Sequence, residues 1–336
     1  MQSSTDKTTP ILIAGGGGFI GGWLVRTLLA KGFTNLRAVD CKPLPEWCQV
    51  FPEVDSRVLD LRLDANSRDA TRGMKIVYNL ACDMGGMGFI ESHKADCMVS
   101  VLINTTLLRA AQEFGIERFF YTSSACAYNG EKQDRPDVPA LKEEDAYPAM
   151  PEDGYGWEKL FSERMCRHFR EDYGLETRVV RLHNVYGPIG TYDGGREKAP
   201  AAICRKVIQA KLDGRREIEI WGDGLQTRSF MYIDDCLIGI DKVMHSGIVD
   251  PINLGSAELV TINHLVDLAE DIAGIKLERR YKLDAPKGVR GRCSDNTLIR
   301  RRLNWEPSTP LRVGLEKTYQ WIYEQLTLPP EKRRTF

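Results

Sequence analysis

The stretch ILIAGGGGFIGGWLVRTLLAKG, residues 11–32, indicates how the chain begins to fold. Its apolar start predicts a buried strand that stops at glycines, and its second half has the periodicity of a helix that ends at a glycine. Between the two, Gly15, Gly18 and Gly21 give a GxxGxxG spacing. Such glycines permit a tight turn and let the backbone approach a pyrophosphate, while N–H groups of the following helix face the anion. The stretch therefore predicts a dinucleotide-binding turn made of Gly15, Gly18, Phe19, Ile20 and Gly21.

An acidic residue closes the second predicted strand, NLRAVD at residues 35–40. At that place Asp40 is expected to hydrogen-bond the adenosine ribose hydroxyls and to repel a 2′-phosphate. This favours NAD over NADP, although Lys42 lies nearby and weakens the distinction. Further on, VLDLR contains Asp60 and Leu61, which are candidates for flanking the adenine, with an ordinary acidic loop as the alternative interpretation.

Apolar strands and amphipathic helices alternate along the first half of the chain. Further strands are predicted at 75–81, 118–124 and 176–187, with helices at 105–115 and 155–174. This alternation predicts an α/β protein with a doubly wound parallel sheet of the Rossmann type.

The pattern becomes looser after Pro188 and predicts a smaller, mixed α/β C-terminal substrate lobe. INLGS, at 252–256, is expected to return to the large sheet as a late strand. We expect residues 1–184 with 228–258 to form the NAD-binding domain, and residues 185–227 with 259–336 to form the substrate lobe.

Composition excludes several classes of protein. The 336 residues carry a formal net charge of −1, so no global basic field favours nucleic acid. No apolar run has the length of a membrane span. Nine cysteines are scattered without CxxC spacing, as is typical of a reduced, cytoplasmic protein. The five histidines show no metal-binding spacing, so no metal site is expected.

Tyr155 and Lys159 stand at i and i+4 in YGWEK, on one face of a predicted helix. A tyrosine alone is a poor base, and a neighbouring ammonium is expected to stabilise its phenolate and lower its pKa. The same ammonium is placed to hold the nicotinamide ribose. Ser124, at the end of the predicted strand RFFYTSS, supplies a hydroxyl for the reacting alcohol.

Together, GxxGxxG, Asp40, SSA, YxxxK and HNVYGP resemble the extended short-chain dehydrogenase/reductase group, which includes the NAD-dependent nucleotide-sugar epimerases and dehydratases. The resemblance implies a tightly held NAD and transient oxidation of a sugar hydroxyl. It also places Asn184, Arg228 and Arg292 at positions that hold the substrate diphosphate, which suits the paired hydrogen bonds of arginine.

Cys126 follows Ser124 by two residues, so continued strand geometry would turn both side chains to the same side. Buried cysteines are often small hydrophobes, and this interpretation stays open. The alternative is chemical. A ketone at C4 of the sugar acidifies the hydrogens on C3 and C5, and inverting either carbon requires a base on one face and an acid on the other. Cys126 and Lys198, from the glycine-flanked loop GGREKAPAA, are the candidate pair.

DMGGMGFIES, SSACAY, GGREKAPAA and WGDGLQTRSF together resemble the GDP-mannose 3,5-epimerase family. This resemblance implies that Ser124, Cys126, Tyr155, Lys159 and Lys198 are catalytic. It implies conversion of GDP-α-D-mannose to GDP-L-galactose and GDP-L-gulose through C4 oxidation, inversion and re-reduction. The implied substrate-binding residues are Gly85, Ser124, Asn184, Glu197, Lys198, Lys206, Gln226, Arg228 and Arg292.

Two other functions remain open from the residues themselves. One is a nucleotide-sugar 4-epimerase with an inert Cys126, and the other is a non-catalytic NAD-binding sensor. A homodimer is expected, because relatives pair through long helices of the nucleotide domain, here 103–115 and 155–174.

Overall fold

The computed structural model describes residues 6–334, and within them seven strands form one parallel sheet in the order β11-β6-β5-β4-β1-β2-β3. The strands are β1 (Ile11–Ala14), β2 (Leu36–Asp40), β3 (Asp55–Val58), β4 (Ile76–Asn79), β5 (Arg118–Ser124), β6 (Glu176–Leu182) and β11 (Ile252–Leu254). This order reverses direction between β1 and β4, and nucleotides bind at such a switch point. The predicted doubly wound sheet is confirmed.

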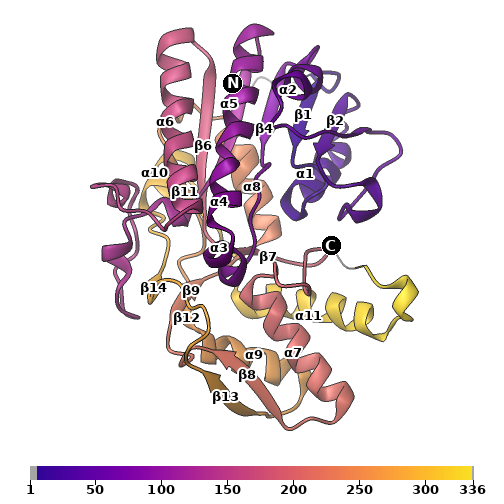
Figure 1. Cartoon of the computed structure of the whole chain (residues 1–336), viewed down its shortest axis with the longest axis vertical. Helices are drawn as coiled ribbons and strands as arrows, with labels where there is room; N and C mark the ends of the chain where they lie inside the picture. Colours follow the sequence, from indigo (N-terminus) through magenta and orange to yellow (C-terminus); the bar gives the residue numbers. More distant parts are fainter. Residues whose placement is uncertain (1–5, 335–336) are drawn as a thin grey trace.

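Helices cover both faces of the sheet (Figure 1). On one face α2, α5 and α6 pack against one another, and on the other face α1 packs against α8. These helices span α1 (Phe19–Ala30), α2 (Asp64–Thr71), α5 (Val101–Glu113), α6 (Tyr155–Tyr173) and α8 (Ile233–Met244). Alternate residues of β1 point to opposite faces, so Ile11 and Ile13 join the α1–α8 core while Leu12 and Ala14 join the other.

The smaller lobe lies below the sheet in Figure 1 and contains short strands with three packed helices. The helices are α7 (Ala199–Asp213), α9 (Ile262–Ala273) and α11 (Leu311–Thr327). The strands are β8 (Glu217–Trp221) paired with β13 (Glu278–Lys282), and β9 (Thr227–Ser229) between β12 (Leu259–Thr261) and β14 (Gly291–Arg292). The mixed character predicted for this part is confirmed.

Short elements connect the two parts. β7 (Val185–Tyr186) pairs with β10 (Met231–Tyr232), α3 (Met87–Ser92) and α4 (Lys94–Val99) follow β4, and α10 (Thr297–Leu303) packs on β11. Turns of 3₁₀ helix occur at Leu44–Glu46, Ala125–Ala127, Gly130–Gln133, Glu143–Ala146 and Pro330–Lys332.

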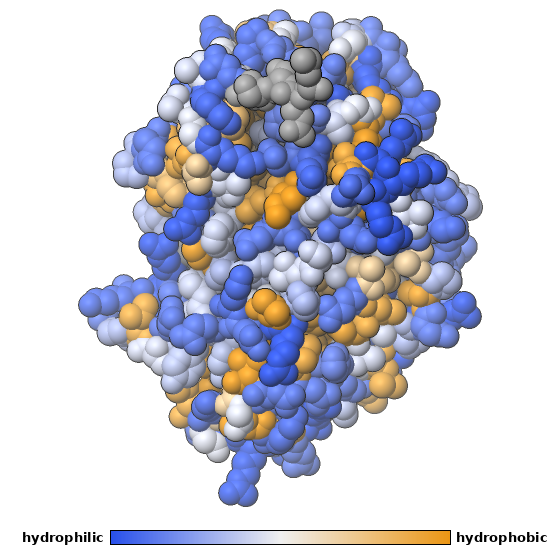
Figure 2. Space-filling view, turned by 180° about the vertical axis from the view of Figure 1, so that it is seen from behind, coloured by the Kyte–Doolittle hydropathy of each residue, from blue (hydrophilic) through white to orange (hydrophobic). Residues whose placement is uncertain are grey.

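Most predicted elements are present, and the differences have physical reasons. The late strand at 252–256 is β11, which pairs with β6. β3 escaped prediction because its sequence, DSRV, is polar and forms the exposed edge of the sheet. Among the described residues, no helix combines the length and the apolar character that a membrane span needs. Seen from behind, the surface is mostly hydrophilic, with hydrophobic residues in separate small patches (Figure 2).

Candidate active site

The glycine-rich turn between β1 and α1 has the geometry that a dinucleotide requires. Gly15 adopts a left-handed φ of 81°, and a Cβ on Gly21 would lie 2.0 Å from the Gly15 carbonyl oxygen. Gly18 is the N-cap residue of α1 and offers no side-chain cap, and the first turn of the helix contains no acid. No carboxylate of this turn therefore competes for the first backbone N–H groups of the helix, and these groups can donate hydrogen bonds to a pyrophosphate. Phe19 and Ile20 form the partly buried start of this helix.

Replacing Gly21 by alanine is expected to displace this turn, because the added methyl overlaps the Gly15 carbonyl. We expect at least a tenfold loss of NAD affinity, about 1.4 kcal/mol, measured by titration calorimetry. Gly22→Ala is the matched control, since its added methyl would lie 3.3 Å from the Gln49 Cβ, a much milder contact than that at Gly21. Equal NAD affinity in both variants would contradict this role of the turn.

The residues expected around the adenosine lie at the ends of neighbouring strands. Asp40 ends β2, and one of its carboxylate oxygens accepts a hydrogen bond from the Lys42 backbone N–H at 3.1 Å. Asp60 forms an ion pair with Arg62 at 2.7 Å, and hydrogen bonds from Arg62 lower the pKa of Asp60. Leu61 is buried. Their roles toward the adenosine stay predictions.

Tyr155 and Lys159 lie on the buried face of the first turns of α6. The Lys159 ammonium donates to the Thr122 carbonyl at 3.1 Å and lies 5.4 Å from the centre of the Tyr155 ring. The predicted lowering of the Tyr155 pKa is not found in this structure. Burial raises the pKa of Tyr155 well above its ordinary value, and the ammonium already faces Glu158 at 3.5 Å.

The strand that was expected to continue from Ser124 through Cys126 does not do so. β5 ends at Ser124, and residues 125–127 form a 3₁₀ turn. The Ser124 hydroxyl caps that turn by accepting a hydrogen bond from the Cys126 N–H at 3.1 Å. The two side chains are therefore brought together by the cap instead of by strand alternation.

Cys126 is buried beside an arginine and a carboxylate. The Arg292 guanidinium donates to the Cys126 sulfur at 3.5 Å, to Gln133 at 2.6 Å, and also to Glu152. Burial raises the pKa of the Cys126 thiol, and Glu152 raises it further, whereas Arg292 and Lys198 lower it. The thiol form is thus favoured at rest, with two cations nearby to stabilise a thiolate.

Lys198 is the N-cap residue of α7, a helix of the small lobe. Its ammonium donates to the Gly85 carbonyl at 2.9 Å, and burial lowers its pKa, which favours the neutral amine. Cys126 is the first of the neighbouring groups that oppose this shift. The structure thus brings Lys198, Cys126 and Gly85 together from three distant segments.

The other predicted substrate residues lie on the small lobe and its border. Asn184 donates to the Ser229 carbonyl at 3.0 Å, Gln226 to the Trp221 carbonyl at 2.8 Å, and Lys206 to the Glu219 carbonyl at 2.9 Å. The Glu197 carboxylate accepts from Arg205 at 3.0 Å.

Two buried arginines stand side by side where a diphosphate is expected. Arg228 on β9 is in register with Arg292 on β14. Arg228 donates to the carbonyls of Thr227 and Lys287, at 2.7 and 3.0 Å, and within residues 6–334 it forms no ion pair. Burial, followed by the charge of Arg292, lowers the pKa of Arg228 to about 10. A bound anion would offset the cost of burying these two positive charges side by side.

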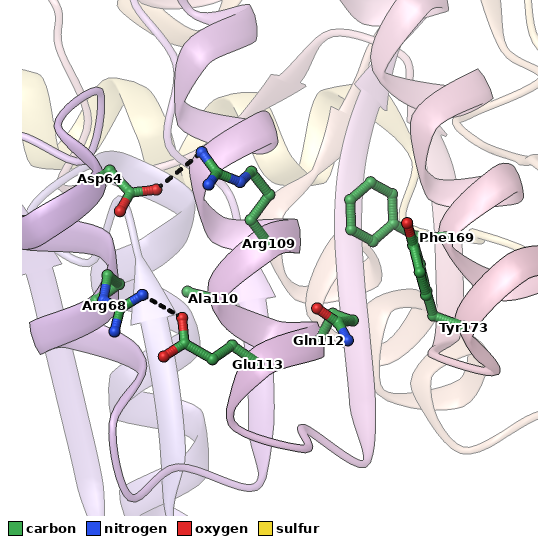
Figure 3. Close-up of a pocket in the computed structure, with 8 residues that line it drawn as sticks. All are labelled: Asp64, Arg68, Arg109, Ala110, Gln112, Glu113, Phe169 and Tyr173. Carbon is green, nitrogen blue, oxygen red and sulfur yellow. Dashed lines mark hydrogen bonds and ion pairs between the residues drawn. The ribbon is translucent and has the colours of Figure 1, made fainter.

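A separate hollow of about 260 Å³ lies between α2, α5 and α6, away from these groups (Figure 3). Its two arginines already pair with acids, Arg109 with Asp64 at 3.1 Å and Arg68 with Glu113. It holds none of the predicted site residues.

Three site residues were missed from the sequence. Cys82, just after β4, faces Tyr155 and helps to raise its pKa. Glu152 contacts Arg292. Arg196 joins the loop that follows β4 by pairing with Asp83 at 2.6 Å. Cys82 could have been predicted, because it lies just after a parallel strand of the sheet. Glu152 could not, because nothing in the sequence distinguishes it from the acidic residues around it.

Comparison with known proteins gives a consistent result. A family model described as the NAD dependent epimerase/dehydratase family matches residues 11–255. GDP-mannose 3,5-epimerase 1 of Oryza sativa subsp. japonica is 45% identical over 331 residues, covering 97% of this chain and 83% of the relative. GDP-mannose 3,5-epimerase of Arabidopsis thaliana is 44% identical over 322 residues, covering 96% and 84%.

The fold has a close counterpart among solved structures. The crystal structure of UDP-glucose 4-epimerase from Thermotoga maritima with UDP-glucose gives a TM-score of 0.85 at 24% identity, covering 95% of this chain and 100% of that chain.

Proposed function

The chain belongs to the NAD dependent epimerase/dehydratase family, and from this premise we propose that it is a GDP-mannose 3,5-epimerase. It converts GDP-α-D-mannose to GDP-L-galactose, with both carbons inverted, and to GDP-L-gulose, inverted at C5 alone. The observation that carries the proposal is the meeting of Cys126 and Lys198 beside Tyr155, because inversion needs an acid and a base that a 4-epimerase does not.

The described residues fit NAD at the glycine-rich turn, with Asp40 toward the ribose and Lys159 toward the nicotinamide end. When bound, NAD supplies a reversible hydride acceptor for C4. Tyr155, as the phenolate, takes the proton of the C4 hydroxyl, and the nearby Lys159 ammonium stabilises that phenolate before the proton arrives. Ser124 orients the reacting hydroxyl.

Cys126 and Lys198 move protons at C5 and then at C3 of the 4-keto sugar. The amine of Lys198 and the thiol of Cys126 have pKa values shifted toward each other, since burial lowers the first and raises the second. Shifts in these directions bring the proton affinities of the two groups toward each other, which suits an acid–base pair. Arg228 and Arg292 are placed to receive the diphosphate.

Identification of the products tests this function. Incubation of the NAD-loaded enzyme with GDP-mannose is expected to give the L-galactose and L-gulose isomers, resolved by NMR. A product inverted at C4 alone, the D-talose isomer, would instead support the 4-epimerase alternative. No conversion of any nucleotide sugar would contradict both.

The two-lobe division at 185–227 and 259–336 stays a proposal. It is supported by β11, which places residues 252–254 in the large sheet, and by the packing of α7, α9 and α11 with one another. We also infer a reducing compartment, the cytoplasm, because all nine cysteines are free.

A homodimer is supported by apolar side chains on α4, α5 and α6, helices that lie side by side in Figure 1. Phe161 and Trp157 on α6 are 55% and 40% exposed, and Met98, Val99 and Leu102 continue the surface. A second copy of the chain that pairs through the same helices would cover them.

Phe161→Glu is expected to convert this dimer to a monomer, since a charge would replace the centre of an apolar contact. Analytical ultracentrifugation measures the change, with Leu283→Glu on the small lobe as the matched control. A wild-type monomer, or a dimer that survives Phe161→Glu, would contradict this interface.

A further inference from the structure

Two inversions by one acid–base pair raise a problem of proton balance. In the mannose ring the hydrogens on C3 and C5 point to the same face. The group that acts as base at C5 must therefore be the base again at C3, yet the first inversion leaves it protonated and leaves the acid deprotonated. Between the two inversions both groups must return to their starting protonation states. This holds whichever of Cys126 and Lys198 is the base.

Glu152 is held directly against Cys126. Its backbone N–H donates to the Cys126 carbonyl at 3.1 Å. One carboxylate oxygen contacts the same Arg292 guanidinium that reaches the Cys126 sulfur at 3.5 Å. The other oxygen, Oε2, is buried and has no hydrogen-bond partner within residues 6–334. A buried carboxylate oxygen without a partner is costly and is ready to accept a proton.

The charges around Glu152 keep its carboxyl group ionised at rest. Burial alone would raise the pKa of this carboxyl group, but Arg292 outweighs burial and holds the pKa below its ordinary value. Cys126 also helps to lower the pKa of Glu152, so the thiol and the carboxylate interact. Glu152 is thus a weak base that can hold the thiol proton only briefly before passing it to water.

Glu152 also lines a hollow. A hollow of about 250 Å³ is lined by Glu152 and by Met87, Ile90, Glu91, Lys94, Asp153, Gly288 and Val289. Cys126 itself is only 6% exposed and is not among the residues that line it. Glu152 therefore belongs both to the surroundings of the buried thiol and to the wall of a space that admits water.

Resting on the function proposed above, we propose that Glu152 is the residue that resets Cys126 between the two inversions by exchanging its proton with water in this hollow. If Cys126 is the base, its S–H proton passes to the Glu152 carboxylate and from there to water, while Lys198 regains a proton from solvent. If Cys126 is the acid, a proton passes from water through the Glu152 carboxylate to the thiolate, while Lys198 releases its proton to solvent. No electrons are transferred and no co-reactant is needed.

Glu152→Gln tests this role, because the amide keeps the shape and loses the proton acceptor. We expect the initial ratio of GDP-L-galactose to GDP-L-gulose to fall at least about tenfold, since acid–base groups contribute about 10²–10⁴ in rate. The first inversion needs no reset, because Cys126 and Lys198 regain their starting protonation states from bulk solvent once the product has left. Only the second inversion, which yields GDP-L-galactose, is therefore slowed. Glu152→Asp is expected to restore part of the ratio. A purely structural loss would slow both inversions together and leave the ratio unchanged.

Asp153→Asn is the matched control, since Asp153 lines the same hollow but pairs with Lys94 at 2.9 Å. It is expected to keep the wild-type ratio. A wild-type enzyme that yields neither product would overturn the proposed function. Wild-type products from an E152Q variant in an unchanged ratio would overturn this inference alone.

A wild-type measurement covers the case in which E152Q does not fold. GDP-mannose carrying deuterium at C5 is converted in ordinary water under single-turnover conditions. A reset through Glu152 and water loses this deuterium, so the doubly inverted product should carry none at C3. Deuterium found at C3 would show direct transfer between Cys126 and Lys198 and would contradict the inference.

Discussion

Cys126→Ala is expected to abolish inversion at C3 and C5 while leaving oxidation at C4 intact. Tyr155, Lys159 and Ser124 are untouched by the change, and they suffice for the first step. The variant should therefore accumulate reduced cofactor, visible as near-ultraviolet absorbance, and release neither L-sugar product. We expect the loss of product formation to be at least about 10³-fold, within the range of acid–base contributions.

Cys97→Ala provides the control for Cys126→Ala. Cys97 is fully buried in the same apolar cluster as Cys126 and Tyr155, so its removal creates a similar small cavity. Turnover in this variant should stay near the wild-type rate. Normal product formation by Cys126→Ala would show that the thiol is a small buried hydrophobe and nothing more.

Tyr155→Phe is expected to stop the reaction one step earlier. Without the phenol oxygen, no group on the first turn of α6 accepts the C4 hydroxyl proton, so neither reduced cofactor nor product should form. The expected loss is about 10²–10⁴-fold. Stopped-flow absorbance separates this result from that of Cys126→Ala, in which the absorbance still rises.

The control for Tyr155→Phe is Tyr192→Phe, because Tyr192 is also buried and its hydroxyl has no hydrogen-bond partner within residues 6–334. This second variant should oxidise C4 at the wild-type rate. An unchanged absorbance rise in Tyr155→Phe would assign the proton transfer to another group, with Cys82 the nearest alternative.

The large sheet was predictable because its information is local. Short runs that contain consecutive apolar or aromatic residues, each followed by glycine or a polar turn, define β1, β4 and β5. The glycines of the first turn are typical of a dinucleotide-binding turn. β3 was not predictable, since an edge strand needs no apolar face. The prediction of strands thus depended on buried apolar residues, and it missed the strand that has none.

The site was predictable residue by residue but not in its contacts. Motifs identified Ser124, Cys126, Tyr155, Lys159 and Lys198, yet the strand geometry assumed between Ser124 and Cys126 is replaced by a capped 3₁₀ turn. The contact of Arg292 with Glu152 and Cys126 joins segments 140 and 166 residues apart. Such tertiary contacts leave no periodic signal in the sequence.

Deuterium exchange tests the central claim, that Cys126 and Lys198 invert C3 and C5, most directly. Wild-type enzyme is incubated with GDP-mannose in D₂O, and the position of the label in the products is read by NMR. We expect deuterium at C5 of GDP-L-gulose and at both C3 and C5 of GDP-L-galactose. Conversion of the substrate with no deuterium at either carbon would contradict that claim.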